Sequence, residues 1–226
     1  MNSTTQTSPV QLRIWQQNLN KSRIAQEVPI NSDVHKNYDL LMLQEPYIDA
    51  YGNMKATRHW RVVYPSSRRM DLALPRAVML ISAALDTNQW TQEHISDTRN
   101  MVAVRINRCF GIIMVNNIYV ECDSSVMVER FWGHLASHHQ GTQSTGGRYM
   151  LWGGDFNRHH PMWDEEQNCH LFTAATLREV DKHLALVADY GMEMLLPKDV
   201  PTLEVMVTKT GPVQTTCLAV TTWGIK

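Results

Sequence analysis

The stretch that most constrains this chain runs from residue 149 to residue 164 and reads YMLWGGDFNRHHPMWD. Its first four residues are apolar, which predicts a buried strand that stops at Gly153 and Gly154. Asp155 and Asn157 follow, and side chains two positions apart share a face in an extended segment. A strand that ends in an acid and an amide is a common way to build a site at a sheet edge. An ordinary polar turn with an Asx cap is the alternative.

A second carboxylate is expected in a similar place. After Asp39, residues 40–43 are continuously apolar, which predicts a strand buried on both faces. Glu45 follows this strand as Asp155 follows its own. Asn18 and Tyr119 also fall at the ends of predicted strands. Four polar residues therefore converge from strand ends, which is a stronger signal than any one of them alone.

Predicted strands outnumber predicted helices along the chain. The strands are expected at residues 12–19, 39–43, 77–82, 101–106, 111–120, 149–152, 192–196 and 202–208. The helices are expected at residues 20–31, 124–138 and 173–189, with Pro29 favouring an early end of the first. Residues 48–75 are interpreted as a solvated loop, and the basic residues around it, Arg76 included, as solvent-facing. This pattern predicts an α/β sandwich of two sheets with helices on the outer faces.

Composition narrows the possible functions only partly. The 22 acidic and 21 basic residues give a net charge of −1, so no global positive field indicates nucleic acid, although a local groove can still be basic. No apolar run approaches the roughly 18 residues of a membrane span, and the start of the chain lacks the apolar core of a secretory signal. The four scattered cysteines suit a reduced compartment. We expect an intracellular monomer without membrane contact, with a disordered arm at residues 1–10.

Four motifs, in this order, resemble the endonuclease/exonuclease/phosphatase family. They are QNLNKS from Gln17, LQEPY from Leu43, NIY from Asn117 and GDFNRHHPMW from Gly154. The resemblance is closest to the apurinic-type endonuclease domains of LINE-type retrotransposons, and it spans about residues 12–163. It implies a DNase-like, four-layer α/β sandwich in which two packed mixed β-sheets are flanked by helices.

The same resemblance implies hydrolysis of phosphodiester bonds in DNA with Mg²⁺, or possible Mn²⁺, as cofactor, and a nuclear location if the chain serves a retrotransposon. It makes Glu45 the principal metal ligand with Asn18 beside it, and carboxylates suit such hard cations. It also makes Asp155 the residue that orients or deprotonates water, Asn157 a donor to the phosphate, and Tyr119 a phosphate-side tyrosine. Two alternatives stay open: Asn18 as a helix cap and Tyr119 as a buried strand aromatic.

Residues 158–164 hold the remaining polar side chains of the opening stretch. His159 and His160 lack suitably placed Cys or His partners for a zinc site. We interpret them, together with Arg158, as residues that pack the loop or contact DNA. Trp163 is expected to be a packing anchor.

The chain departs from the family pattern at its C-terminus. Family members close with a strand followed by Ser-Asp-His, and this sequence contains no such tripeptide. We expect a domain over residues 11–213 that lacks its last strand or strands, and an atypical tail, residues 214–226, that resembles a frame-shifted sequence or matches one by coincidence. On the first reading the tail is poorly packed and the Asp155 side of the cleft is open to solvent. The expected activity is an impaired nuclease; the alternatives are a catalytically dead remnant or a nucleic-acid-binding module with the same fold.

Overall fold

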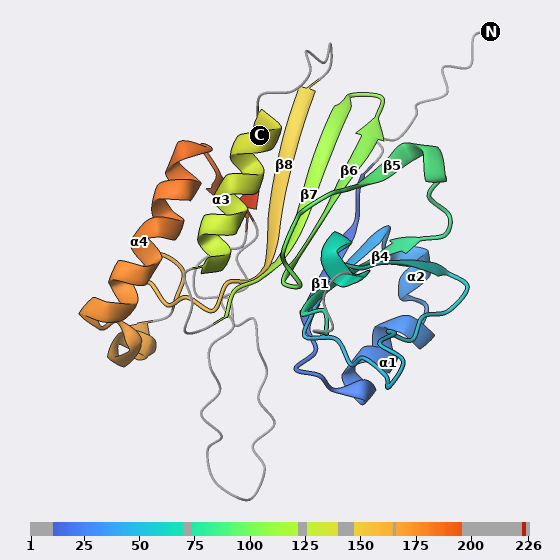
Figure 1. The fold of residues 1–226 in the computed structure, drawn as a ribbon, viewed down its shortest axis with the longest axis horizontal. Helices are drawn as coiled ribbons and strands as arrows, with labels where there is room; N and C mark the ends of the chain where they lie inside the picture. Colours follow the sequence, from blue (N-terminus) through green and yellow to red (C-terminus); the bar gives the residue numbers. More distant parts are fainter. Residues whose placement is uncertain are drawn as a thin grey trace, which may run out of the picture.

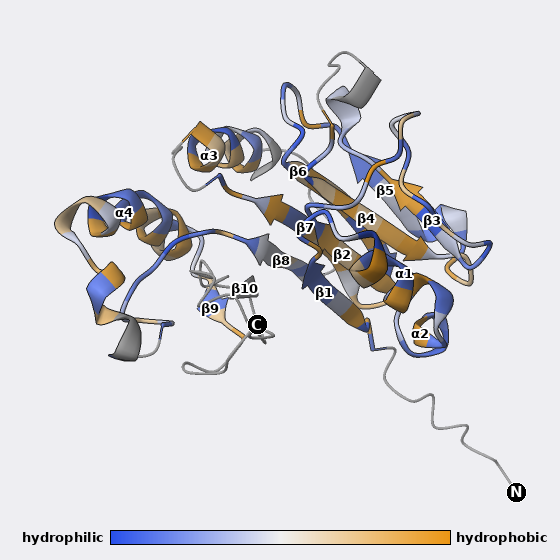
Figure 2. Cartoon of the chain, turned by 90° about the horizontal axis from the view of Figure 1, so that it is seen from below, coloured by the Kyte–Doolittle hydropathy of each residue, from blue (hydrophilic) through white to orange (hydrophobic). Residues whose placement is uncertain are grey.

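The computed structural model describes residues 11–69, 74–121, 126–139, 147–164, 166–195 and 223–224. Two β-sheets pack face to face in the middle of the molecule. Helices lie on both outer sides: α3 and α4 next to one sheet, α1 and α2 next to the other (Figures 1 and 2). The four-layer sandwich of mixed sheets predicted from the sequence is therefore confirmed.

The first sheet has the strand order β1-β2-β4-β3. Its strands are β1 (Ile14–Asn18), β2 (Leu40–Gln44), β4 (Ala77–Ser82) and β3 (Trp60–Val63). Strands β1 and β2 run parallel, with Asn18 opposite Gln44 at their carboxyl ends. The other two pairs are antiparallel, and Gln44 lies opposite Ala77. The end of β2 and the start of β4 therefore lie side by side.

The second sheet has the strand order β5-β6-β7-β8-β10-β9. Its strands are β5 (Trp90–Glu93), β6 (Met101–Arg108), β7 (Gly111–Tyr119), β8 (Gly147–Asp155), β10 (Trp223–Gly224) and β9 (Glu193–Met194). Strands β7 and β8 run parallel, and Tyr119 lies opposite Asp155 at their carboxyl ends. Each sheet thus contains a parallel pair whose last residues are polar.

The described residues include four α-helices, and two of them begin at a residue whose hydroxyl accepts from a backbone N–H of the first turn. They are α1 (Arg23–Asn31), α2 (Val34–Asn37), α3 (Val126–His139) and α4 (Ala174–Asp189), with short 3₁₀ turns η1 (Ser66–Arg69), η2 (Thr87–Gln89) and η3 (Glu166–Leu171). The Ser22 hydroxyl accepts from Ala25 N–H at the start of α1, and Thr173 does the same for α4. Pro29 lies inside α1, which continues to Asn31. None of the helices in the described ranges is long and apolar enough to cross a membrane.

Strand β2 shows why its sequence is continuously apolar. Leu40 and Met42 belong to the core between the sheets, where they meet residues of β6 and β7 such as Val104. Leu41 and Leu43 point the other way, into a second core on the α1 side of the sheet. Both faces of the strand are therefore buried, as the run of apolar residues predicted.

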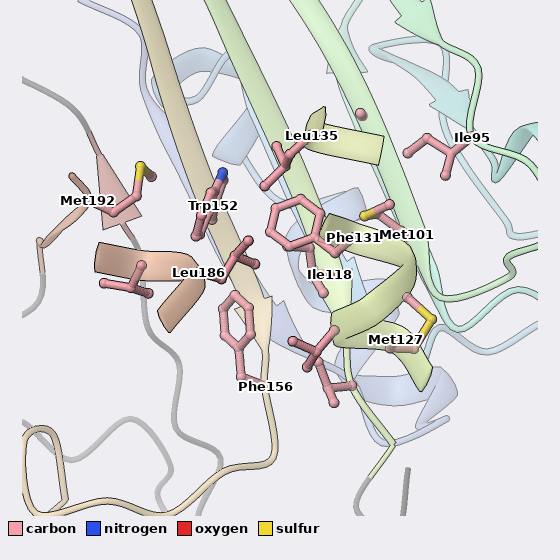
Figure 3. Close-up of a cluster of buried hydrophobic side chains, with 14 residues drawn as sticks. Ile95, Met101, Ile118, Met127, Phe131, Leu135, Trp152, Phe156, Leu186 and Met192 are labelled. Carbon is pink, nitrogen blue, oxygen red and sulfur yellow. The ribbon is translucent and has the colours of Figure 1, made fainter. Parts of the chain in front are cut away.

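A third core joins β8 to α3 and α4. Trp152 of β8 is fully buried, and the ring of Phe131 from α3 meets it edge-on with the ring centroids 4.8 Å apart. Figure 3 shows Phe156 and Leu186 beside them. Truncating an aromatic side chain in such a core costs about 3–5 kcal/mol. This core fixes the strand that carries Asp155.

Two local expectations are wrong. The region 48–75 is not wholly a loop, because Trp60–Val63 forms the edge strand β3, with Trp60 and Val63 buried. Gly153 and Gly154 do not end their strand, because β8 continues to Asp155. Gly154 has a φ of 151°, and a Cβ there would lie 1.9 Å from the Ile118 carbonyl oxygen of β7. These glycines allow close approach between neighbouring elements rather than a break in the strand.

The described part of the atypical tail is short. Trp223 pairs with Trp152 of β8 on one side and with Met194 of β9 on the other. The rest of residues 214–226, the strand expected at 202–208 and the arm at 1–10 lie outside the described residues. The expected opening of the cleft beside Asp155 is wrong, because Asp155 is only 1% exposed.

Candidate active site

The carboxyl ends of the two parallel pairs meet across the sandwich. The first sheet contributes Asn18 and Glu45, and the second contributes Tyr119 and Asp155. The Asn18 side chain donates to Asp155 Oδ2 at 2.7 Å and so connects the two sheets directly. The structure thus brings together the four strand-end residues that the sequence indicated. With Arg76, described below, they form the group called here the carboxylate site.

Asn18 aligns two acids. Its Nδ2 donates to Asp155 Oδ2 and also faces Glu45 Oε2 at 3.4 Å. Its Oδ1 accepts from the backbone N–H of Asn20 at 2.7 Å. Because a backbone N–H can only donate, this contact fixes which end of the amide faces the carboxylates. An amide nitrogen of this kind is not a metal ligand, so Asn18 in this arrangement positions the acids. The alternative of a helix cap is wrong, because Ser22 caps α1.

Asp155 is buried and receives two donors. Besides Asn18, the backbone N–H of Asn157 donates to Asp155 Oδ1 at 3.0 Å. Burial is the largest influence and raises the pKa of Asp155 to about 6; the bond from Asn18 opposes this rise and the charge of Glu45 adds to it. A carboxylate with such a pKa exchanges a proton near neutral pH.

Glu45 and Asn157, the residue two positions after Asp155, have unusual backbone angles. Glu45 has a φ of 45° and Asn157 a φ of 46°. Positive φ is expensive for a glutamate, by about 1–3 kcal/mol, and persists only where the surroundings fix it. The Glu45 N–H donates to the Arg76 carbonyl at 2.7 Å, and Asn157 Nδ2 donates to the Val120 carbonyl at 2.8 Å. Both turns are therefore held from neighbouring strands.

Arg76 is the site residue that sequence reasoning missed. It lies just before β4, and its Nη2 donates to Glu45 Oε1 at 2.7 Å and to the Tyr119 hydroxyl at 2.6 Å. Its guanidinium carbon lies 4.3 Å from the centroid of the Tyr119 ring. No local sequence signal indicates it: Arg76 reaches Glu45 because residues 40–44 pair antiparallel with residues 77–81, which brings the start of one strand beside the end of the other. Tyr119 is itself buried, so it is both a strand aromatic and a member of the site.

A set of buried amides holds the ends of the sheets together beneath the carboxylates. Gln44 Nε2 donates to Asn117 Oδ1 at 2.5 Å, and Asn117 Nδ2 donates to the Val78 carbonyl at 2.8 Å. Gln16 Nε2 donates to the Gly154 carbonyl at 3.1 Å. Buried polar groups of this kind are costly unless they are paired, so the bonds favour one relative placement of the sheets.

Residues 158–164, called here the histidine loop, close mostly on themselves. Asp164 Oδ2 accepts from the His160 N–H at 2.7 Å, and Asp164 Oδ1 lies 3.4 Å from His159 Nδ1. Trp163 packs against the third core and donates to the Arg158 carbonyl at 2.8 Å, which confirms it as a packing anchor.

Arg158, predicted to contact DNA, is only 4% exposed. Its Nη1 donates to the carbonyls of Glu121 and Asn157 at 3.3 and 3.0 Å. A guanidinium used in this way supports the loop, and little of it is accessible to a phosphate. The contacts of His159 and His160 favour the loop-packing half of their interpretation.

The donor set at the carboxylate site fits a hard divalent cation. Glu45 and Asp155 offer oxygen ligands, and the shared donor Asn18 holds them together. Mg²⁺ binds through one or two carboxylates and fills its remaining positions with water and phosphate oxygens. Within the described ranges, no three side chains of His, Cys, Asp or Glu gather into a closed metal cage. The site therefore suits Mg²⁺ or Mn²⁺ better than a structural zinc ion.

No protein-family model matches this chain, and no curated protein matches it in sequence. Its structure is similar to the endonuclease domain of TRAS1, a telomere-specific non-LTR retrotransposon, with a TM-score of 0.66 and 19% identity over 94% of this chain and 84% of that one. It is also similar to an endonuclease/exonuclease/phosphatase family protein from Leptotrichia buccalis C-1013-b, with a TM-score of 0.52 and 12% identity over 95% and 87% of the two chains. The chain therefore has the DNase-like, two-sheet fold of endonuclease/exonuclease/phosphatase proteins.

Proposed function

We propose that this protein hydrolyses phosphodiester bonds in DNA with the help of Mg²⁺ or Mn²⁺. The observation that carries the proposal is the Asn18 amide, which joins Asp155 of one sheet to Glu45 of the other. It places two carboxylates beside a tyrosine hydroxyl and an arginine at one edge of the sandwich. The similarity in fold to the TRAS1 endonuclease domain supports DNA as the substrate.

Glu45 is the residue that would hold the metal, with Asn18 keeping the carboxylate in place. When bound, a divalent cation would polarise the phosphate and offset the negative charge that develops on its oxygens. The chain itself supplies the proton acceptor and the hydrogen-bond donors.

The remaining residues divide the other tasks. Asp155 orients the attacking water and accepts its proton as the water oxygen bonds to phosphorus. The bond from phosphorus to the leaving sugar oxygen breaks, and that oxygen takes up a proton from solvent water. Tyr119 and Asn157 donate hydrogen bonds to phosphate oxygens. Asn157 has two amide hydrogens, and its bond to the Val120 carbonyl uses one of them. Donors aimed at the developing charge usually make the largest single contribution to such catalysis.

We expect slow cleavage. The sequence contains no Ser-Asp-His tripeptide, which supplies the imidazole in the family that it resembles. Losing one general acid or base typically lowers the rate by about 10²–10⁴-fold. If the loss of cleavage were complete, the chain would be a nucleic-acid-binding module with the same fold.

Nicking of supercoiled plasmid in Mg²⁺ tests the proposal, with Asp155→Asn as the variant. Asp33→Asn is the matched control, because Asp33 pairs with Lys36 at the surface and its side chain is 72% exposed. We expect weak nicking by the wild type and the control, and none by Asp155→Asn. Nicking that survives in Asp155→Asn would contradict the assignment. Binding of a labelled duplex in Ca²⁺ without any nicking in Mg²⁺ would favour the binding module.

A further inference from the structure

Arg76 holds Glu45 in two ways at once. Its carbonyl accepts from the Glu45 N–H at 2.7 Å, which supports the positive φ of that residue. Its Nη2 donates to Glu45 Oε1, also at 2.7 Å. One residue therefore fixes both the backbone and the carboxylate of the candidate metal ligand. The side chain of Arg76 is 22% exposed, so the contact is largely sheltered from solvent.

The two oxygens of Glu45 consequently face different groups. Oε1 meets Arg76, and Lys21 Nζ approaches the same oxygen at 3.9 Å. Oε2 faces Asn18, whose amide also binds Asp155. The cationic side chains thus occupy Oε1, and Oε2 faces only the weaker, 3.4 Å contact with the Asn18 amide that Glu45 shares with Asp155. A carboxylate held in this way would offer Oε2, and not Oε1, to a divalent cation.

Arg76 also sets the direction of the Tyr119 hydroxyl. A guanidinium can only donate, so the phenolic oxygen accepts from Nη2 at 2.6 Å. The hydroxyl hydrogen must then point to a different partner. The guanidinium also lies against the face of the Tyr119 ring, which holds the ring in place. The position of the Tyr119 side chain is thereby fixed by Arg76 at both its ring and its hydroxyl oxygen.

We propose that Arg76 is a positioning residue for phosphodiester cleavage: it reserves Glu45 Oε1, so that Oε2 would serve the metal, and it fixes the position of the Tyr119 ring and hydroxyl oxygen on the phosphate side of the site. This inference rests on the function proposed above. A single residue, Arg76, then contacts both Glu45 on the metal side and Tyr119 on the phosphate side of the site. Lysine cannot replace it fully, because an ammonium lacks the flat guanidinium that lies on the ring while donating to two acceptors.

The first test measures binding of Mn²⁺ alone by calorimetry, for wild type, Arg76→Ala and Glu45→Gln. Removing a positive charge beside a ligand carboxylate favours a cation. We therefore expect Arg76→Ala to bind Mn²⁺ at least as tightly as wild type, and Glu45→Gln to lose binding. If Arg76→Ala loses Mn²⁺ as Glu45→Gln does, Arg76 only holds the fold of the site together and the proposal is overturned.

The second test measures single-turnover cleavage at saturating Mg²⁺. We expect the rate constant of Arg76→Ala to fall about 10- to 100-fold, the range typical of residues that orient metal ligands. Added guanidinium ion should restore part of this rate by filling the vacated position, and Arg76→Lys should lie between wild type and Arg76→Ala. Arg105→Ala is the matched control, because the Arg105 side chain pairs with Glu93, which is not a partner of Arg76, and is 42% exposed. It should cleave like wild type and not respond to guanidinium.

The outcomes separate the two proposals. A wild-type protein that neither binds Mn²⁺ through Glu45 nor cleaves DNA contradicts the proposed function and the role of Arg76 together. A wild-type protein that cleaves, with Arg76→Ala as active as Arg105→Ala, contradicts the role of Arg76 alone. A slow Arg76→Ala that guanidinium does not rescue also overturns it.

Discussion

The histidine loop begins three residues after Asp155 of the carboxylate site, but the contacts that hold the two regions together differ. Asn18 and Asp155 are 137 positions apart in sequence, and Arg76 and Tyr119 are 43 apart. In the loop, His160 and Asp164 are four positions apart, and Trp163 and Arg158 five. The first arrangement exists only when both sheets are complete. The second is largely a local turn, so a dense group of polar residues in sequence is not by itself evidence of a reactive site.

Asp155 of the carboxylate site and His183, which packs beneath the histidine loop, have pKa values that shift in opposite directions. Burial raises the pKa of Asp155 in the carboxylate site to about 6. Burial, and then the charge of Arg158, lower the pKa of His183 to about 4. His183 lies beneath the loop, with its ring centroid 4.6 Å from that of Phe156 and 6.3 Å from that of Trp163. Lowering the pH therefore stabilises the folded state through Asp155 and destabilises it through His183.

The largest expected effect concerns His183. Because its folded pKa lies below the ordinary 6.5, it contributes stability that is complete above pH 6.5 and is lost as the pH falls toward 4, by up to about 3 kcal/mol. The raised pKa of Asp155 acts in the opposite sense, since its contribution is lost as the pH rises from 3.8 to about 6. Urea unfolding in EDTA between pH 4 and 6.5 should therefore show a small net slope in wild type.

The variant His183→Gln removes one of these two opposing contributions. Its free energy of unfolding should fall more steeply than that of the wild type as the pH rises through this window, because the contribution of His183 no longer opposes that of Asp155. Adding Asp155→Asn should flatten the curve again. A His183→Gln protein with the pH dependence of wild type would show that the buried histidine is not neutral in the folded state.

The next effect concerns the bond between the sheets. Asn18→Ala removes the donor shared by Asp155 and Glu45. We expect cleavage to fall about 10- to 100-fold while the protein remains folded, because the acids lose their relative alignment. Plasmid nicking and circular dichroism check the two parts. An Asn18→Ala protein that cleaves at the wild-type rate would mean that the amide contributes nothing to the alignment.

A smaller effect is expected from the corresponding change in the loop. Asp164→Asn weakens the acceptor that closes the loop on His159 and His160. Unfolding free energy should fall by about 1–2 kcal/mol, as for a weakened buried hydrogen bond, with cleavage unchanged. This result would sharpen the contrast between the regions. A large loss of cleavage without loss of stability would place the loop in the reaction and erase the contrast.

The sequence predicted the strands whose burial leaves a clear pattern. Residues 40–43 are apolar throughout because both faces of β2 are covered, and Asp155 and Tyr119 end neighbouring parallel strands. Strand β3 was missed because four residues at a sheet edge, among glycine, proline and arginine, leave no periodicity. The two glycines of β8 predict a strand end when only the sequence is considered. The close approach of the neighbouring strand, which leaves no room for a Cβ at Gly154, is not visible in the sequence.

The assembled site was predictable only as far as strand ends indicated it. Arg76 contacts Glu45 and Tyr119 because β2 and β4 pair antiparallel, and no local pattern encodes that pairing. The positive φ of Glu45 depends on the same neighbour. Conversely, Arg158 looked accessible because it stands among polar residues, and the backbone carbonyls that surround it come from the folded loop and from Glu121. Whether each of these residues reaches the site therefore depends on tertiary contacts, which the local sequence does not show.

The most direct test of the central claim, that Glu45 and Asp155 form a divalent-metal site at the edge of the sandwich, is the thermal melting of the protein with and without Mg²⁺. At ten times Kd, a bound metal stabilises the folded state by about 1.4 kcal/mol, which for a chain of this size raises Tm by roughly 3–6 °C. We expect this rise in wild type and in Asp164→Asn, and no rise in Glu45→Gln. An equal rise in wild type and Glu45→Gln would contradict the assignment.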